Sequence, residues 1–332
     1  MLRYTLRRLA WLPIILFGVS LIAFVLLRAL PGQDPAAAIA GQGATEEQLE
    51  RIRQDLGLDK PVFPIGISSE FPWLEFQADS QYGQWISGML RLDPGEEFRS
   101  QQPILDLFWQ KFPASFQIVM MSFLVSVIVG ISVGIISAVY RNGFVDYVAR
   151  LFTVAASSIP EPFLLALLII VPAYLWNYSQ PVGGYVPIYE DPVENLRLFL
   201  PPAIIVGIAS SAGLVRLTRT TMLEMLRADY VRTAHAKGLT RTTVITRHAL
   251  RNSMTPILTT VGTGFVAVFG GSILVEQVLS IDGLGLWFFN SAFIRDLPVV
   301  QFLVVYTAFV VVMVNLIVDL SYGWADPRVR YS

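Results

Sequence analysis

The sequence contains no cysteine, which excludes disulfides, thiolate metal sites and cysteine nucleophiles. It has only two histidines, His235 and His248, and they lack the spacing of metal ligands. It also lacks a G-x-x-x-x-G-K-[ST] phosphate loop, so it cannot supply an ATP site of that type. No nucleophile cluster, acid pair or metal-ligand set falls within its apolar segments, which disfavours a membrane enzyme.

Apolar residues dominate the chain instead. They make up 54% of it, and the mean hydropathy of +0.57 is too high for a soluble domain of 332 residues. A helix needs roughly 20 apolar residues to cross a hydrocarbon core of about 30 Å. Six segments meet that length and predict an all-α polytopic membrane protein with six transmembrane helices: 9–30, 114–140, 151–176, 199–215, 256–275 and 299–320.

The basic residues predict the orientation of these helices. An even number of crossings places both termini on one side of the membrane. Arg3, Arg7 and Arg8 precede the first segment, and Arg328 and Arg330 follow the last. Because basic residues favour the cytoplasmic side, we expect both termini in the cytoplasm.

The first apolar segment also has features of a cleavable signal peptide. Arginines precede it, and Ala38-Ile39-Ala40 resembles a signal-peptidase site. The uncharged run 9–27 is longer than the usual signal-peptide core, however, and its loss would leave an odd number of spans. We therefore expect residues 1–30 to be a retained transmembrane helix.

Residues 31–112 are expected to form an external region, because their net charge of −7 suits the outer face. A capping-box pattern at Thr45 and Gln48, with Gly57 as a stop, predicts one short amphipathic helix. Tyr82 and Trp85 indicate a second one at the membrane interface. The region is either a structural cap on the spans or a landing surface for an external binding protein. Residues 113–323 would form a five-helix core, and 324–332 a cytoplasmic tail.

A basic stretch separates the fourth and fifth spans. Residues 216–251 include two acidic side chains, Glu224 and Asp229, and a much larger basic set, which predicts a cytoplasmic position. The basic residues are Arg216, Arg219, Arg227, Arg232, Lys237, Arg241, Arg247 and Arg251.

Residues 229–252, which overlap the second half of this stretch and are here called the elbow, carry the signals of two short helices. Asp229 is placed to cap a helix through Tyr230 to Lys237, and Gly238 can take the left-handed stop. Thr240 can start a second helix with one common face: Val244, Ile245, His248, Ala249 and Asn252. Two ordered helices at an angle fit a groove on a soluble partner, whereas a loop held by anionic lipid needs no such order.

The elbow resembles the cytoplasmic coupling motif of ABC-transporter permeases of the dipeptide and oligopeptide family, through DYVRTAHAKGL and RHALRNSMTPI. The resemblance continues through MLRYTLRRL, LRALPGQDP, LGLDKPV, KFPASFQI, LPPAI, SIDGLGLWF and VNLIVDLSYGWADPRVRY. Arg232, Thr233 and Ala234 occupy the Glu-Ala-Ala places of the general motif, a departure usual for the peptide branch. Residues 63–78 have no counterpart and are interpreted as an insertion.

The resemblance implies a permease subunit of the bacterial inner membrane that forms half of a path for peptides or peptide-like solutes. Its implied partners are a second homologous permease, two cytoplasmic ABC ATPases and an external solute-binding protein, without nucleic acid. ATP and Mg would bind to the ATPases, so this chain would need no cofactor and would not be an enzyme. The implied ATPase-coupling residues are Asp229, Tyr230, Arg232, Thr233, Ala234, Lys237, Gly238 and Leu239. Similar relatives carry nickel complexes or glutathione, which leaves those cargoes open.

Glu161 lies between Pro160 and Pro162 in the third span. An ionised side chain at mid-depth costs about 2.5 to 3.5 kcal/mol, so it should face a cavity or a partner. It either lines the solute path and attracts a peptide amino group, or marks a kink or an early helix end at the external surface.

Small residues indicate close helix packing at Gly130, Gly134, Gly262 and Gly264.

A secondary transporter or channel with six spans would also be apolar and basic inside. Such a protein does not need a capped docking helix, and the inverted repeats typical of secondary transporters are not visible between the two halves. The sequence therefore favours an ABC permease over this alternative.

Overall fold

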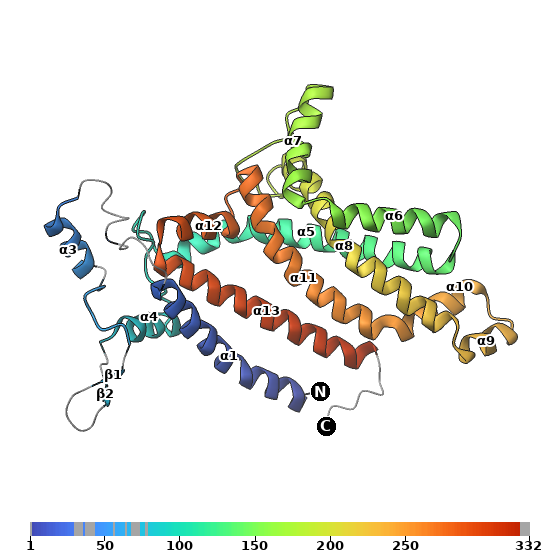
Figure 1. Cartoon of the computed structure of the whole chain (residues 1–332), viewed down its shortest axis with the longest axis horizontal. Coiled ribbons are helices and arrows are strands. Elements are labelled where there is room, and N and C mark those ends of the chain that lie inside the picture. Colours follow the sequence, from blue (N-terminus) through green and yellow to red (C-terminus); the bar gives the residue numbers. More distant parts are fainter. Residues whose placement is uncertain are drawn as a thin grey trace. The chain divides into compact units, whose positions relative to one another are not determined.

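The structure is a computed structural model that describes residues 2–29, 36, 44–55, 57–63, 65–67, 74–76 and 79–325. Figure 1 labels its elements. In chain order they are α1 (Leu2–Ala29), α3 (Glu46–Asp55), β1 (Ile65–Ile67), β2 (Leu74–Phe76), α4 (Gln81–Leu90), α5 (Ile104–Val139), α6 (Phe144–Ser158), α7 (Glu161–Trp176), α8 (Pro192–Leu226), α9 (Asp229–Ala236), α10 (Arg241–Thr243), the π-helix η1 (Val244–Leu250), α11 (Arg251–Leu279), α12 (Leu284–Ile294) and α13 (Leu297–Ala325).

Long apolar helices account for most of the described chain. Five are long and apolar enough to cross a membrane, and α6 with α7 makes a sixth candidate if this pair is one span. The two helices of the pair meet at a bend of 95°. The six predicted segments therefore all fall on candidate spans, and the third is broken at Pro160 because proline interrupts helical hydrogen bonding.

The all-α fold class is confirmed, and one short strand pair accompanies the helices. The strands β1 and β2 pair antiparallel, with Ile65 opposite Phe76, within the segment interpreted as an insertion. A strand pair of this length adds little stability by itself.

The chain divides into two compact units, of which unit 1 comprises residues 1–11, 113–286 and 310–332. Its core is formed where α5, α7, α8 and α11 meet, around fully buried Ile118, Leu165, Phe199 and Val275. Asp191 begins α8 by accepting hydrogen bonds from the backbone of Val193 and Glu194, a normal cap for a helix with proline in its first turn. The core thus joins helices that are far apart in sequence.

Glycines allow close approach of two helix pairs, α5 with α8 and α11 with α13. A Cβ on Gly134 would lie 2.6 Å from the Cβ of Thr218 on α8, and a Cβ on Gly130 would lie 2.6 Å from Leu214. A Cβ on Gly262 would collide with Val318 of α13, whereas Gly264 has open space around it. The first three glycines are therefore placed where the facing helix leaves no room for a side chain.

Unit 2 comprises residues 12–112 and 287–309. Its α3 begins with the expected capping box, since the amide of Thr45 donates to Gln48 Oε1 at 2.9 Å and the amide of Gln48 donates to Thr45 Oγ1 at 3.4 Å. Gly57 follows with φ of +63°. The short amphipathic helix predicted here is thus present, with both of its end signals.

The second amphipathic helix predicted within residues 31–112 is α4. Its buried Tyr82 shares a hydrogen bond of 2.9 Å with Ser20 of α1. The ring centroids of Tyr82 and Trp85 also lie 5.0 and 6.3 Å from the ring centroid of Phe24. The aromatic face predicted for the membrane interface is therefore used to pack against α1.

Asp296 connects three segments of unit 2. It is fully buried at the start of α13, where its carboxylate accepts hydrogen bonds from the amide of Phe98 at 2.7 Å and from that of Val299 at 3.3 Å. Glu97, beside Phe98, accepts from the indole of Trp287 at 2.8 Å. These bonds attach the loop before α5 to α12 and to the start of α13.

Replacing Gly134 with alanine should destabilise the protein by about 1 to 3 kcal/mol, because the added methyl group overpacks the contact with α8. Gly264→Ala is the matched control: it also replaces a glycine inside a helix but meets open space, so it should be neutral or stabilising. Thermal unfolding followed by tryptophan fluorescence measures both. Equal effects of the two substitutions would contradict the close contact.

The stability of unit 2 should depend on pH through the buried side chain of Asp296. Burial raises the pKa of Asp296 from 3.8 to about 6. Because the folded state holds this proton more tightly, the side chain stabilises unit 2 most at low pH, and the contribution, roughly 3 kcal/mol at most, is lost as the pH rises through the folded pKa.

Hydrogen exchange of the buried α13 segment around Val300 and Leu303, which reports unfolding of unit 2, should therefore show greater protection below this pKa than above it after correction for the intrinsic rate. In Asp296→Asn, which cannot titrate, the protection should be the same at both pH values. An unchanged pH dependence in the variant would assign it to another group.

Candidate functional site

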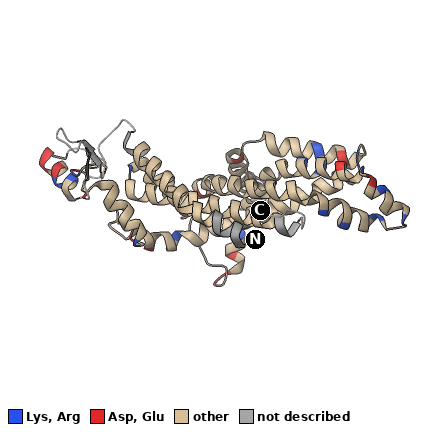
Figure 2. Ribbon diagram, turned by 90° about the horizontal axis from the view of Figure 1, so that it is seen from below, with Lys and Arg blue, Asp and Glu red and all other residues tan. Residues whose placement is uncertain are grey.

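The elbow lies at one end of unit 1, beside the turn between α5 and α6 (Figure 1). Helix α8 ends at Leu226, Ala228 takes the N-cap position of α9, and α9 runs only from Asp229 to Ala236. Lysines and arginines line this end of the unit (Figure 2). A short helix in a basic segment is thus held beyond the ends of the long apolar helices.

Helix α9 has one packed face and one free face. Val231 and Ala234 are only 2% and 5% exposed, and they form a cluster with Val244 of η1. The side chains of Asp229 and Arg232 are 94% and 78% exposed, and their ion pair is 3.5 Å long. The packed residues hold the helix in place, so the opposite face is available to a partner.

The predicted coupling residues divide between these two faces. Asp229, Tyr230, Arg232, Thr233, Lys237, Gly238 and Leu239 are exposed, whereas Ala234 is buried. Ala234 therefore supports the helix, and the other members of the set form the accessible surface.

The expected cap of α9 was misplaced by one residue. Asp229 is the first helical residue, and the N-cap is Ala228, which has no side chain that could accept a hydrogen bond. A carboxylate in the first turn still favours the positive end of the helix. The interpretation of Asp229 as the cap was wrong because Asp is favourable at both positions, and the sequence does not separate them.

The end of α9 is the predicted glycine turn. Gly238 has φ of +77°, and its amide donates to the carbonyl of His235 at 2.9 Å. The amide of Leu239 donates to the carbonyl of Ala234 at 3.3 Å. Thr240 then caps the next helix by accepting from the amide of Thr243 at 3.4 Å. These bonds give the elbow a defined direction.

The pattern predicted a separate short helix after Thr240, and this prediction is wrong. The segment is the beginning of one continuous helix through α10, η1 and α11, from Arg241 to Leu279. The π-helical turn in η1 adds a residue to the turn and shifts the buried face. Val244 and Ala249 are buried as expected, but the next buried residue is Ser253, and Asn252 is exposed.

Three long helices support the elbow. Arg241 of α10 donates to the carbonyl of Val139 at 3.3 Å, at the end of α5, and its guanidinium lies 5.7 Å from the centre of the Tyr140 ring. Ala249 of η1 shares a buried cluster with Met222 of α8 and Ala138 of α5. The segment that follows α9 is therefore in direct contact with α5 and α8 and is continuous with α11, so a displacement of α9 can move all three helices.

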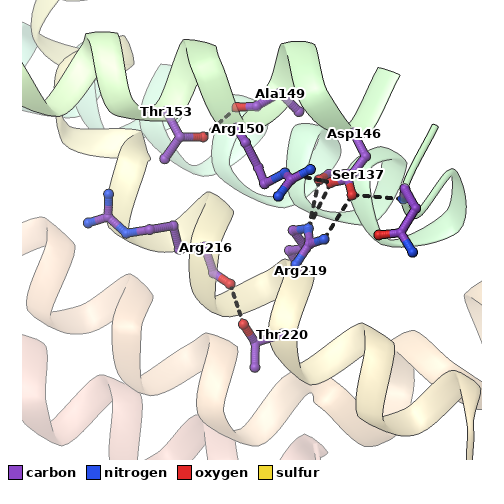
Figure 3. A network of polar contacts seen from close by, with 9 residues as sticks. Ser137, Asp146, Ala149, Arg150, Thr153, Arg216, Arg219 and Thr220 are labelled. Atoms are coloured by element: carbon purple, nitrogen blue, oxygen red, sulfur yellow. Dashed lines mark hydrogen bonds and ion pairs between the residues drawn. The ribbon is translucent and has the colours of Figure 1, made fainter. Parts of the chain in front are cut away.

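A buried charge network joins the same end of three helices (Figure 3). Asp146 of α6 is fully buried, and both of its carboxylate oxygens accept from Arg219 of α8 at 2.8 Å. Ser137 of α5 donates to Asp146 at 2.6 Å, and the amide of Asn142 donates at 3.0 Å. Arg150 adds a longer ion pair of 3.8 Å. Removing one partner from such a pair leaves an uncompensated buried charge, which costs about 3 to 5 kcal/mol.

Sequence reasoning did not select Asp146. The available signal was an acidic residue in a short turn that otherwise carries arginines, between two apolar spans. That signal does not identify the partner, because Arg219 is 73 residues away.

Glu161 lies at the bend between α6 and α7. It is partly exposed in the first turn of α7, where the helix dipole favours a negative charge. Its carboxylate interacts with the side chain of Ser210 of α8, and a Cβ on Gly271 of α11 would lie 3.1 Å from it. Glu161 therefore lies at a helix break, and its carboxylate also faces the neighbouring helices α8 and α11.

A second glutamate explains the glycine-rich turn after α11. Glu276 is fully buried, and it accepts from the hydroxyl of Ser115 at 2.6 Å and from the amide of Leu286 at 2.9 Å. A Cβ on Gly283 would lie 2.5 Å from this carboxylate, and a Cβ on Gly285 would lie 2.8 Å from the Cα of Ile273. The turn thus wraps around a buried acid that sequence reasoning missed.

Comparison with known proteins identifies the family. The family model described as binding-protein-dependent transport system inner membrane component matches residues 130–331, and the model of its N-terminal part matches residues 1–119. The dipeptide transport system permease protein DppB of Escherichia coli (strain K12) is 34% identical, with 100% of both chains covered. DppB of Alkalihalophilus pseudofirmus is 31% identical, again over 100% of both chains.

The fold agrees with this assignment. An inward-facing structure of the MetNI methionine ABC transporter matches with a TM-score of 0.51 and 14% identity, covering 68% of this chain and 99% of that chain. The resemblance inferred from the sequence is thus confirmed. The chain belongs to the family of binding-protein-dependent transport system inner membrane components and is a multi-pass inner-membrane permease subunit of an ABC importer.

Proposed function

We propose that this permease forms one half of the translocation path of a peptide importer. Relatives named for dipeptide transport align with it from end to end, which supports a peptide cargo. The other half would come from a second homologous permease. Two cytoplasmic ATPases would bind ATP and Mg²⁺, and an external binding protein would deliver the solute. Hydrolysis would occur in the ATPases, because this sequence has no phosphate loop.

The proposed orientation places the elbow and both termini in the cytoplasm and residues 31–112 outside. The basic excess around α9 and the acidic excess of the external region support it, because basic loops favour the cytoplasmic side. In this orientation the free face of α9 points toward the ATPases.

The exposed face of α9 is the observation that carries the proposal. Tyr230 of α9 and Leu239, which follows the Gly238 turn, are large apolar side chains that are 39% and 38% exposed, and the other face of α9 is already packed. Together with Arg232 they combine apolar, aromatic and charged groups, the composition of residues that dominate binding energy at protein interfaces. A groove on an ATPase is the partner that fits this short helix.

Movement of α9 would reach the membrane through its supports. Its packed face pushes on Val244 at the base of the continuous helix that becomes α11. Arg241 links the same base to α5, and the Asp146–Arg219 pair links α6 to α8. Closure of the ATPases would thereby tilt several spans together and open the path alternately to each side of the membrane.

Glu161 is proposed to line that path. It is ionisable, lies at a helix break, and faces Ser210 and Gly271 from α8 and α11. A carboxylate in this position can attract the ammonium group of a peptide. Nickel complexes and glutathione are the alternative cargoes of the same architecture.

Replacing Tyr230 and Arg232 with alanine should weaken association with the ATPase at least tenfold, because it truncates the free face without touching the packed one. The assay is a binding titration of purified ATPase against the permease in lipid nanodiscs.

Arg91→Ala, which removes one positive charge from the external region, is the control and should bind normally. Normal ATPase binding by the Tyr230/Arg232 double variant would exclude this face as the docking surface.

Replacing Glu161 with glutamine should reduce uptake of peptides that have a free amino terminus about tenfold or more, since a charge-assisted hydrogen bond is lost. Uptake of the same peptides with an acetylated amino terminus should change little. The test is competitive uptake by cells that carry each variant.

Glu190→Gln, at an exposed position before α8, is the control for loss of one carboxylate. Should Glu161→Gln transport both peptide classes like the parent protein, Glu161 does not contact the cargo. Preference for nickel complexes or glutathione in the same competition would replace the peptide assignment while leaving the permease role intact.

A further inference from the structure

A cavity of about 310 Å³ opens between α6 and α8, next to the buried Asp146. Its buried wall is formed by Ala149, Thr153 and Val215, and its polar rim includes Arg150, Arg216 and Arg219. Its volume is within the range of ligand sites in proteins. Neither the coupling role of the elbow nor the position of Glu161 accounts for this cavity.

The arginines at the cavity carry more charge than the protein neutralises. Arg219 occupies both oxygens of Asp146, so Arg150 is left with a 3.8 Å contact to the same carboxylate and with the face of the Tyr147 ring 4.4 Å away. Arg216 makes no ion pair within the part of the chain that the structure describes. The cavity rim thus carries three guanidinium groups but only one carboxylate, which pairs with two of them.

Figure 3 shows how these side chains are arranged. Arg150 and Arg219 point toward Asp146, whereas Arg216 extends away from this cluster on the side of Thr153. The excess positive charge is therefore spread along the rim of the cavity. An arginine on a membrane helix without a carboxylate partner requires water or another anion.

An apolar surface lies directly beside this charge. The outer face of α6 exposes Tyr147, Val148, Leu151 and Val154, of which Leu151 is 71% exposed. Val154 also lines the cavity, so the apolar face and the basic rim are continuous. A ligand that fills both must have an anionic head and a long apolar tail.

We propose that this cavity binds an anionic phospholipid, with its phosphate between Arg150 and Arg216 and an acyl chain along the outer face of α6. Arg150 lies about two turns after the start of α6, and Arg216 lies about three turns before the end of α8. From these positions their long side chains can extend toward the headgroups of the cytoplasmic leaflet in the proposed orientation. The lipid would join α6 to α8 at the level of the Asp146–Arg219 pair.

The test is titration of the delipidated full-length transporter, in uncharged detergent, with phosphatidylglycerol, phosphatidylcholine or inorganic phosphate. Native mass spectrometry and thermal unfolding report binding. Phosphatidylglycerol should bind and stabilise the protein, and the other two should do so much less. The double variant Arg150→Gln/Arg216→Gln should bind phosphatidylglycerol roughly tenfold or more weakly.

Arg197→Gln is the matched control, because Arg197 is an exposed arginine at the opposite end of α8. It should retain tight phosphatidylglycerol binding. Undiminished binding by the double variant would overturn the proposal, and so would equal stabilisation by inorganic phosphate, which would indicate a site for a free anion.

A second measurement tests whether a partner permease covers this face instead. Since the sequence has no cysteine, a single Val154→Cys substitution provides a unique attachment point. A photoactivatable cross-linker on this residue should label phosphatidylglycerol in the assembled transporter. Cross-linking to the second permease in place of lipid would contradict the proposal. Neither measurement depends on the identity of the transported solute.

Discussion

The packing of Val231 and Ala234 against Val244 is the contact on which the rest of the arrangement depends. An isolated helix as short as α9 is unstable in water, because nucleation costs more than a few hydrogen bonds return. Burial of these two residues fixes α9 to the base of the continuous helix that becomes α11. The same contact determines which face of α9 stays exposed, and this is the face proposed to bind a partner.

Buried polar groups distribute this attachment over several helices. The Asp146–Arg219 pair joins α6 to α8, and Ser137 adds α5. At the other end of α11, Glu276 holds the turn at Gly283 and Gly285 and accepts from Ser115 of α5. Helices in lipid gain little from hydrophobic association, because lipid tails are equally apolar, so such polar contacts and close glycine packing specify which helices meet.

Much of this arrangement could be predicted from the sequence. Spans follow from apolar length, and the α9 turn follows from Gly238 and Thr240, because both signals are local. What the sequence did not reveal depends on distant residues or small backbone differences. The roles of Asp146 and Glu276 depend on their hydrogen bonds with Arg219 and Ser115, which are distant from them in the sequence. The π-helical turn shifted the buried face from Asn252 to Ser253 because periodicity assumes a regular α-helix.

The most direct test of the coupling role is the accessibility of a single cysteine at Thr233, an exposed position on α9 in a chain without other cysteines. A membrane-impermeant maleimide should fail to label it in intact cells, should label it in inverted vesicles stripped of the ATPases, and should be blocked when the ATPases are added back. Labelling from outside the cell, or labelling that the ATPases leave unchanged, would contradict the account.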